Sequence, residues 1–162
     1  MGEDVFERLW EAHAHRLVGF LVYRTGDRAL AEDVVAETFE RVVRARRAFD
    51  PQKGSEKTWI YSIALNLLRD HARRGRVEER ALERVVAGSA GSDLGANGAV
   101  EDRDVIMRAM SDLSEEEREA IALRYIAELT IPEIGQLTGE SPKTIEGRVY
   151  RALGKMRDEV VD

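Results

Sequence analysis

The sequence predicts an all-α protein made of two small helical domains joined by a flexible linker. Apolar residues recur at intervals of three and four along most of the chain, and no alternating strand pattern exceeds a few residues. Residues 88–99, GSAGSDLGANGA, bury too little apolar area to offset their ordering entropy. Just before them, residues 77–86 form a short helical pattern that would be marginal in isolation. We therefore expect domains at residues 1–80 and 100–162, with a linker at 81–99.

A first helix is predicted over residues 4–24. One face of it carries the residues expected to point inward, which are Phe6, Leu9, Trp10, His13, Leu17, Phe20 and Leu21. We expect His13 to be a buried or half-buried structural residue rather than a ligand. Gly26 suits the end of this helix, and Asp27 suits the N-cap of the next one.

The second predicted helix covers residues 28–49 and has one apolar and one charged face. Its expected core positions are Val34, Val35, Thr38, Phe39, Val42 and Ala45. Its opposite face carries Asp33, Glu37, Glu40, Arg41 and Arg44. Such a charged face is usually only solvated, so the pattern by itself assigns it no partner.

A loop follows at residues 49–57, because Pro51 disfavours helix at Asp50 and Gly54 interrupts the next turn. A third helix is predicted over residues 58–74. Its inward positions are expected to be Trp59, Ile60, Ile63, Leu67 and His71. Its other face lines up Ser62, Asn66, Arg69 and Arg73, at helical spacing.

The second domain begins with an amphipathic segment over residues 100–113, and three further helices follow. Two of them start with the S/T-x-x-E capping box, which pairs Ser114 with Glu117 and Thr130 with Glu133. The last helix starts with Ser141 followed by Pro142, a residue favoured at the first helical position. Gly139 suits the left-handed residue that ends the middle helix.

The last helix combines an apolar stripe with a polar, cationic flank. Its expected buried residues are Ile145, Val149, Leu153, Met156 and Val160. The flank consists of Thr144, Arg148, Arg151 and Lys155. A helix of this kind after a short helix and a tight turn is typical of the helix-turn-helix motif, whose recognition helix enters the major groove. Its entering end carries Pro142, Lys143 and Thr144, where the helix dipole also favours phosphate.

Gly147 is predicted to point away from the core, where glycine costs up to about 1 kcal/mol relative to alanine. A close approach of the backbone to DNA would explain it, and so would simple tolerance of an exposed glycine. Glu146 beside it is unfavourable near phosphates unless it accepts a hydrogen bond from a cytosine amino group. The whole constellation predicts DNA binding rather than a plain helical bundle.

The net charge of −6 argues at first against DNA binding, which depends on Lys and Arg. The cations are clustered, however, in RVVRARRAFDPQKGSEK, in RDHARRGR and along the last helix. Cysteine is absent, which excludes a disulfide framework and thiolate metal ligation. The chain also lacks a P-loop, zinc-ligand spacing and the Glu-x-x-His motif of di-metal bundles. We therefore expect no catalysis, no cofactor and no metal.

The N-terminal segment has acidic residues where a signal peptide has cations. No uncharged run approaches the roughly 18 residues of a membrane span. We expect a cytoplasmic protein with no membrane association and no small-molecule substrate.

Three blocks of the chain resemble the bacterial extracytoplasmic-function (ECF) sigma factors of the sigma-70 superfamily. These are LWEAHAHRLVGFLVYRTGDRALAEDVVAETFERVVR, FDPQKGSEKTWIYSIALNLLRDHARR and LSEEEREAIALRYIAELTIPEIGQLTGESPKTIEGRVYRALGKMR, in the order of the family. The resemblance implies that the first domain is sigma region 2 and the second is sigma region 4. It implies an initiation subunit that directs core RNA polymerase to promoters. The implied partners are the β′ clamp coiled coil and β flap of core RNA polymerase, promoter DNA and an anti-sigma factor.

The resemblance also implies roles for individual residues. The polymerase-binding candidates are Asp33, Glu37, Glu40 and Arg41. The candidates for reading the minus-ten element as single-stranded DNA are Lys53, Ser62, Asn66, Arg69, Arg73 and Arg74. The candidates for reading the minus-thirty-five element as duplex are Lys143, Thr144, Gly147, Arg148 and Arg151. The chain departs from the family at Leu65, where Arg is common, and at Glu146-Gly147, where Lys-Ser is common.

One alternative is a transcription regulator of the response-regulator or quorum-sensing type. Those proteins have a similar C-terminal helix-turn-helix motif but do not need the block FDPQKGSEKTWIYSIALNLLRD. Association with core polymerase distinguishes the two classes.

Overall fold

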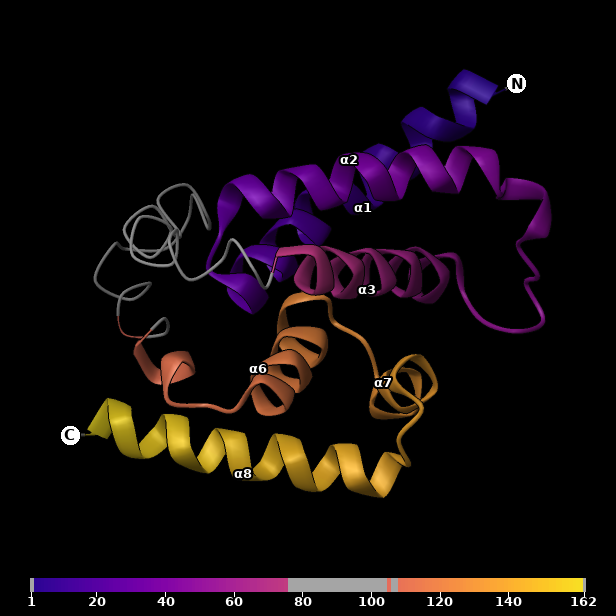
Figure 1. The fold of residues 1–162 in the computed structure, drawn as a ribbon. Helices are drawn as coiled ribbons and strands as arrows, with labels where there is room; N and C mark the ends of the chain where they lie inside the picture. The colour runs from indigo at the N-terminus through magenta and orange to yellow at the C-terminus, as the bar shows by residue number, and fades with distance from the viewer. Residues whose placement is uncertain (1, 76–104, 106–107, 162) are drawn as a thin grey trace. The chain divides into compact units, whose positions relative to one another are not determined.

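The computed structural model describes residues 2–75, 105 and 108–161, so the predicted linker and the helical pattern at 77–86 lie outside the described residues. The described part of the chain contains helices and turns and no strands, which confirms the all-α prediction. The chain divides into two compact units, Met1–Ala90 and Gly91–Asp162. Figure 1 shows the helices of both units.

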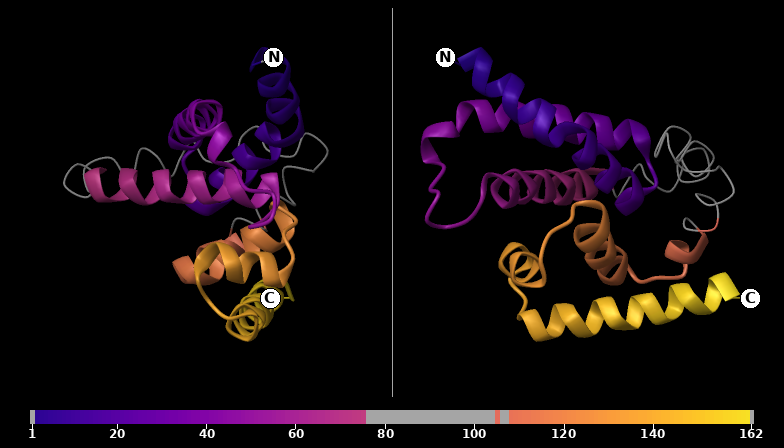
Figure 2. Two further views of the ribbon diagram at one scale, coloured as in Figure 1. Left: turned by 90° about the vertical axis from the view of Figure 1, so that its right-hand side faces the viewer. Right: turned by 180° about the vertical axis from the view of Figure 1, so that it is seen from behind.

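Three long helices build the N-terminal unit (Figures 1 and 2). They are α1 (Gly2–Thr25), α2 (Arg28–Arg44) and α3 (Glu56–Gly75), with the short 3₁₀ helix η1 (Arg46–Ala48) after α2. Helix α2 packs against both α1 and α3. The largest fully buried side chains of this unit are Leu17, Phe20, Leu21, Phe39, Ile60, Tyr61, Leu65 and Leu67. Burial of each such side chain stabilises the unit by roughly 1.5–3 kcal/mol relative to exposure, which is why these helices associate.

The turn between α1 and α2 follows the predicted cap signals. Gly26 adopts a left-handed φ of 73°, and its N–H donates to the carbonyl of Val22 at 2.7 Å. The Asp27 carboxylate accepts from the backbone N–H of Leu30 at 3.0 Å, which satisfies one free donor of the first turn of α2. The predicted roles of Gly26 and Asp27 are confirmed.

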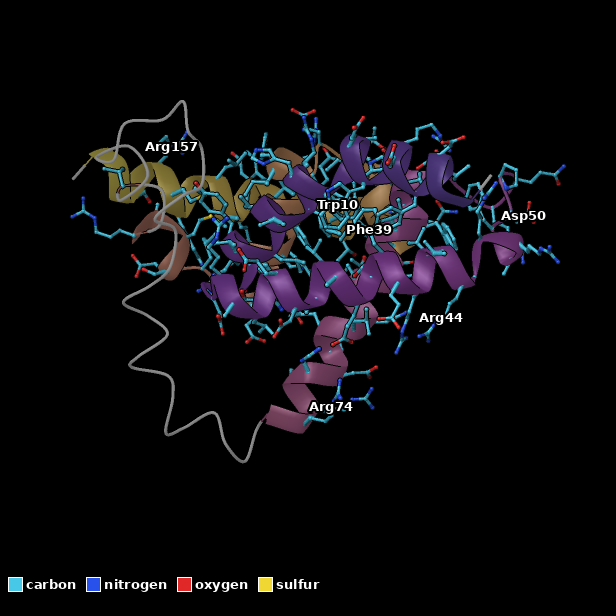
Figure 3. The ribbon with its side chains drawn as sticks, turned by 90° about the horizontal axis from the view of Figure 1, so that it is seen from above. Trp10, Phe39, Arg44, Asp50, Arg74 and Arg157 are labelled. Carbon is cyan, nitrogen blue, oxygen red and sulfur yellow. The ribbon has the colours of Figure 1, made fainter. Side chains whose placement is uncertain are left out.

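The N-terminal end of the buried stripe was predicted wrongly, because Phe6 and Trp10 are 36% and 42% exposed. Their rings stack on each other with centroids 5.8 Å apart, and Trp10 also packs edge-on against buried Phe39 at 5.0 Å (Figure 3). Each ring therefore covers the core with one face and leaves the other face open. Periodicity identifies the side of a helix but not how far its neighbour extends beside it.

Two helix boundaries differ from the predictions. Helix α2 ends at Arg44 instead of residue 49, and its C-cap Ala45 is half-buried rather than buried. Helix α3 begins at Glu56 because Ser55 caps it: its hydroxyl accepts from the N–H of Thr58, and its own N–H donates to the Thr58 hydroxyl, both at 3.1 Å. This reciprocal pair of hydrogen bonds between Ser55 and Thr58 was not among the predicted helix caps.

The inward face of α3 is rotated relative to the prediction. Ile60 and Leu67 are buried as expected, but Trp59, Ile63 and His71 are only half-buried. Further residues of α3 are buried that were not among the predicted inward positions, among them Tyr61, Ala64, Leu65 and Leu68.

The C-terminal unit contains α6 (Glu115–Ile121), the π-helical turn η2 (Ala122–Ile126), α7 (Ile131–Thr138) and α8 (Pro142–Val161), after a helical stretch at 108–111. Helices α6 and α7 both pack against α8, as the lower part of Figure 1 shows. The core of this unit includes Met110, Leu123, Leu129, Ile134, Ile145, Val149 and Ala152. Leu153 was expected in this core but is 40% exposed, because Ala152 occupies the inward position at that turn.

The helix starts of this unit follow the predictions from local sequence. Both capping boxes form in full, with Ser114 and Glu117 at α6 and with Thr130 and Glu133 at α7. Helix α8 begins at Pro142, as predicted. These local signals are strong because each satisfies N–H groups that a helix start otherwise leaves without a partner.

The turn of the helix-turn-helix motif is tight. Gly139 ends α7 in the left-handed conformation, with φ 79°, and its N–H donates to the Gly135 carbonyl at 2.9 Å. A Cβ atom on Gly135 would lie 2.7 Å from the carbonyl oxygen of Glu140, which is closer than side chains can approach. The motif therefore requires glycine at position 135.

A second backbone feature of this unit precedes α7. The turn η2 is π-helical, with the N–H of Ala127 donating to the carbonyl of Ala122 at 2.9 Å. The next residue, Glu128, has a φ of 58°. Among the described residues, it is the one non-glycine residue with a positive φ. Chain direction thus changes sharply here before Thr130 caps α7.

Candidate nucleic-acid interface

The N-terminal end of α8 presents a polar surface. Lys143 and Thr144 are exposed, and Ser141 caps the helix by accepting from the N–H of Thr144 at 3.1 Å. The Ser141 hydroxyl also donates to the Thr144 hydroxyl at 2.9 Å. These contacts order the first turn, so its polar groups have fixed positions before any ligand arrives.

One turn further along α8, Gly147 leaves room for a neighbouring cation. A Cβ atom added at Gly147 would lie 3.3 Å from Nη1 of Arg151, so the guanidinium extends back over the glycine. Arg151 itself is exposed. Lys143, Thr144, Gly147 and Arg151 are thus brought together along one side of α8.

Arg148 differs from these residues, because only 15% of its side chain is exposed. Its Nη2 lies 3.7 Å from a carboxylate oxygen of Glu116 in α6 and 3.6 Å from one of Glu140 in the turn. Sequence periodicity placed Arg148 on the cationic flank, and it gave no sign of these two carboxylates. Its charge is therefore already partly balanced within the unit.

Lys155 also turns toward α6. Its Nζ lies 2.8 Å from Oε1 of Glu117, which is the one buried charged residue in the described part of the chain. The hydrogen bond from Lys155 lowers the pKa of Glu117 below its usual range, and the bond from the Ser114 backbone N–H adds to this. Lys155 thus joins α8 to α6 through a direct ion pair.

The predicted minus-ten residues lie on α3 and the loop before it. Asn66, Arg69, Arg73 and Arg74 are exposed, whereas Ser62 is half-buried and donates to the carbonyl of Trp59 at 2.6 Å. Nη1 of Arg69 donates to Oδ1 of Asn66 at 3.4 Å, and Arg73 pairs with Asp70. Lys53 is exposed in a turn closed by its own N–H and the carbonyl of Asp50, at 3.0 Å.

The charged face of α2 carries the predicted polymerase-binding residues. Asp33, Glu40 and Arg41 are exposed, and Glu40 pairs with Arg44. Glu37 is half-buried because Nε2 of His71 in α3 lies 3.1 Å from its Oε1. The structure therefore holds Glu37 in place, a contact that the sequence did not reveal because the two residues are far apart along the chain.

Two further titratable side chains of the N-terminal unit, Arg8 and His13, lie on α1. Arg8 of α1 donates twice to Glu56 of α3, at 2.9 and 3.2 Å, and this lowers the pKa of Glu56. His13 is half-buried, as expected, and burial is the main cause that lowers its pKa. No group of three or more His, Asp or Glu side chains in the described residues is arranged to hold a metal ion. Among the described helices, none combines the length and apolar character needed to cross a membrane.

Comparison with protein families gives two matches, one in each unit. The model of sigma-70 region 2 matches residues 9–77, and the model of sigma-70 region 4 matches residues 103–156. RNA polymerase sigma factor CarQ of Myxococcus xanthus is 33% identical, over 96% of this chain and 89% of CarQ. The ECF sigma factor SigM of Bacillus subtilis is 27% identical, over 93% of this chain and 92% of SigM.

Solved structures give the same result. The chain resembles CnrH, solved in complex with the cytosolic domain of CnrY, with a TM-score of 0.69, 26% identity and coverage of 98% of this chain and 88% of CnrH. The fold also resembles sigma factor RpoE from Bartonella quintana, solved with the anti-sigma factor NepR, with a TM-score of 0.78, 24% identity and coverage of 98% and 97%. The chain therefore belongs to the extracytoplasmic-function sigma factors of the sigma-70 family.

Proposed function

We propose a division of labour among three surfaces of this chain, which as a member of its family is an alternative sigma factor that directs transcription initiation. Residues 1–80 act as region 2, which binds core polymerase and reads the melted minus-ten element. Residues 100–162 act as region 4, which reads the duplex minus-thirty-five element. One observation carries the proposal: the region 2 model matches the first unit and the region 4 model matches the second.

The polymerase surface is assigned to the charged face of α2. Asp33, Glu37, Glu40 and Arg41 lie on this face, opposite the residues that α2 buries. His71 contributes by orienting Glu37 from α3. We assign this face to the clamp coiled coil of the β′ subunit and a further contact of region 4 to the β flap.

The minus-ten surface is assigned to the loop that carries Lys53 and to one side of α3. Asn66 offers amide donors and acceptors for an unpaired base, and Ser62 is its neighbour one turn earlier. Arg69, Arg73 and Arg74 supply a cationic track for the phosphates of a single strand. Leu65 is buried, so this chain makes no base contact from that position.

The minus-thirty-five surface is assigned to the exposed side of α8. Lys143 and Thr144 stand at the helix N-terminus, where donors and the dipole favour phosphate. Gly147 lets the helix backbone approach the groove, and Arg151 reaches base edges or phosphates beside it. Arg148 contributes from a position held by Glu116 and Glu140.

The acidic net charge implies that the free chain binds promoter DNA weakly. A chain of net charge −6 with two small basic surfaces gains little from counterion release. On the polymerase, both surfaces act together, and the effective concentration of the second site raises the overall affinity. The chain itself catalyses no covalent step, and it acts where bacterial polymerase and promoter DNA are found, in the cytoplasm.

An anti-sigma factor is the partner that would control this activity. CnrH, which this chain resembles at 26% identity, was solved with the cytosolic domain of CnrY. A protein that covers α2 would block the surface assigned to polymerase. Binding of the anti-sigma factor and binding of core polymerase are thus expected to compete.

The test is reconstitution with core RNA polymerase. DNA retained by the holoenzyme is sequenced, and the recovered promoter is used for run-off transcription and for binding by the free chain. We expect specific transcription by the holoenzyme and weak binding by the free chain. Tight, specific binding by the free chain without polymerase association would instead support the regulator of the response-regulator or quorum-sensing type. Asp33→Asn and Glu40→Gln should weaken polymerase association, with Glu7→Gln at an exposed position of α1 as the control.

A further inference from the structure

Two arginines outside the surfaces assigned above lie on the 3₁₀ turn after α2. Arg46 and Arg47 are both exposed. Within the part of the N-terminal unit that the structure describes, neither has an acidic partner at ion-pair distance, whereas Arg8 and Arg44 each pair with a glutamate. Their charges are therefore not balanced by the unit itself.

The turn that carries these arginines has a defined conformation. The N–H of Ala48 donates to the carbonyl of Ala45 at 2.8 Å, and that of Phe49 donates to the carbonyl of Arg46 at 3.2 Å. The ring of Phe49 packs on Trp59 of α3, with centroids 5.1 Å apart. The turn is thus packed against the start of α3. Arg46 and Arg47 therefore keep a fixed position relative to the loop that joins this turn to α3.

Positive charge accumulates along this connection. Residues 41–53 contain five cations and one acid, in a chain whose net charge is −6. The one acid, Asp50, is engaged locally, because its carboxylate accepts from the N–H of Gln52 at 2.9 Å. Figure 3 shows Arg44 and Asp50 at the same end of α2. The loop that carries Lys53 therefore continues a cationic surface that starts with Arg46 and Arg47.

We propose that Arg46 and Arg47 bind backbone phosphates of promoter DNA beside the segment that the minus-ten loop reads. This inference rests on the proposed function of that loop. A guanidinium without an internal carboxylate partner is suited to a phosphate, which it meets with two parallel hydrogen bonds. The contact would fix the position of the DNA without reading its sequence.

The experiment measures the affinity of the reconstituted holoenzyme for fork-junction DNA at several salt concentrations. The probe carries the promoter recovered with the wild-type holoenzyme, and a second probe has its minus-ten bases replaced. We compare Arg46→Ala, Arg47→Ala, the double alanine variant and the double lysine variant. Arg16→Ala is the matched control, because it removes one exposed charge from α1.

Each alanine variant should reduce the magnitude of the slope of log K against log salt by about 0.7–0.9, as expected for one lost phosphate contact. The double alanine variant should lose roughly twice as much, and both probes should weaken by the same factor. The double lysine variant should keep most of the slope, because counterion release depends on the number of cations at the phosphates. Arg16→Ala should leave the slope unchanged.

Three results would overturn the inference. The first is a slope that stays at its wild-type value in the double alanine variant. The loss could appear in association with core polymerase, which would assign the arginines to an acidic protein surface. The loss could be confined to the probe with the original minus-ten bases, which would indicate base reading. Thermal unfolding of each variant shows that it is folded.

Failure of the proposed function is a separate result. It would appear in the wild-type chain, as a lack of polymerase association or of promoter selection, and the inference would fall with it. A wild-type holoenzyme that selects promoters, together with an unchanged slope in the double alanine variant, would reject the inference alone.

Discussion

Nζ of Lys155 on α8 lies 2.8 Å from Oε1 of Glu117 on α6, and only 9% of the Glu117 side chain is exposed. The same carboxylate oxygen accepts from the backbone N–H of Ser114 at 2.9 Å, so it joins the capping box of α6 to α8. One buried carboxylate therefore connects the start of α6 to the orientation of α8.

Replacing Lys155 with methionine should destabilise the C-terminal unit. The change keeps the apolar part of the side chain and leaves Glu117 without its cationic partner. We expect a loss of about 1 kcal/mol in the free energy of unfolding, because Lys155 is half-exposed and water weakens the pair. Chemical denaturation at neutral pH measures it. Lys143→Met is the control, and an equal loss there would contradict this role for Lys155.

Gly135→Ala should destabilise the helix-turn-helix motif. The new Cβ would meet the Glu140 carbonyl oxygen at 2.7 Å, and overpacking of this kind costs about 1–3 kcal/mol. Gly154→Ala on α8 is the matched control, because no atom lies within 4 Å of its added Cβ. That control should instead gain up to about 1 kcal/mol from helix propensity. Thermal unfolding compares the two, and equal stability would show that the turn can relax.

Gly147→Ala should separate stability from DNA binding. An added Cβ lies 3.3 Å from Nη1 of Arg151, so the guanidinium must shift by a few tenths of an ångström. The folded unit should be as stable as the wild type or slightly more stable, because alanine favours helix. We expect the binding free energy of the holoenzyme for duplex minus-thirty-five DNA to weaken by about 1.4 kcal/mol, which is a tenfold loss of affinity. Unchanged affinity would mean that the glycine is merely tolerated.

The Arg8 and Glu56 pair should make stability depend on acid pH. The pKa of Glu56 in the folded chain is lowered, first by the hydrogen bond from Arg8, so folding favours the ionised carboxylate. This contribution is complete above the unfolded pKa of about 4.3 and is lost as the pH falls through the lower folded value. Arg8→Met should therefore lower the melting temperature at pH 7 and make little difference near pH 3. Arg47→Met, at an exposed arginine of the same unit that takes part in none of the ion pairs described above, should show no such trend.

The sequence was sufficient for features that depend on a few neighbouring residues. The capping boxes of α6 and α7 and the left-handed Gly139 form as predicted, because each satisfies backbone groups within one turn. Helical periodicity likewise identified buried residues on four helices, among them Leu17, Val34 and Ile145. The described helices and the order of the two units followed from these signals.

Features that depend on contacts between distant segments could not be read from the sequence. Trp10 and Leu153 lie on apolar stripes, yet both are exposed: Trp10 covers the core with one side of its ring only, and Ala152 takes the inward position beside Leu153. Arg148 has the spacing of a DNA-facing residue, but carboxylates of α6 and of the preceding turn engage it. The π-helical turn before α7 has no sequence signal of its own.

Glu128 holds a left-handed backbone conformation that costs an ordinary side chain roughly 1–2 kcal/mol. Asparagine adopts this conformation more easily, so Glu128→Asn relieves backbone strain at a residue that is not among those assigned here to DNA or polymerase. A chain relieved of this strain would tolerate destabilising substitutions on α8. It would be a practical starting scaffold for redirecting the protein to promoters of choice.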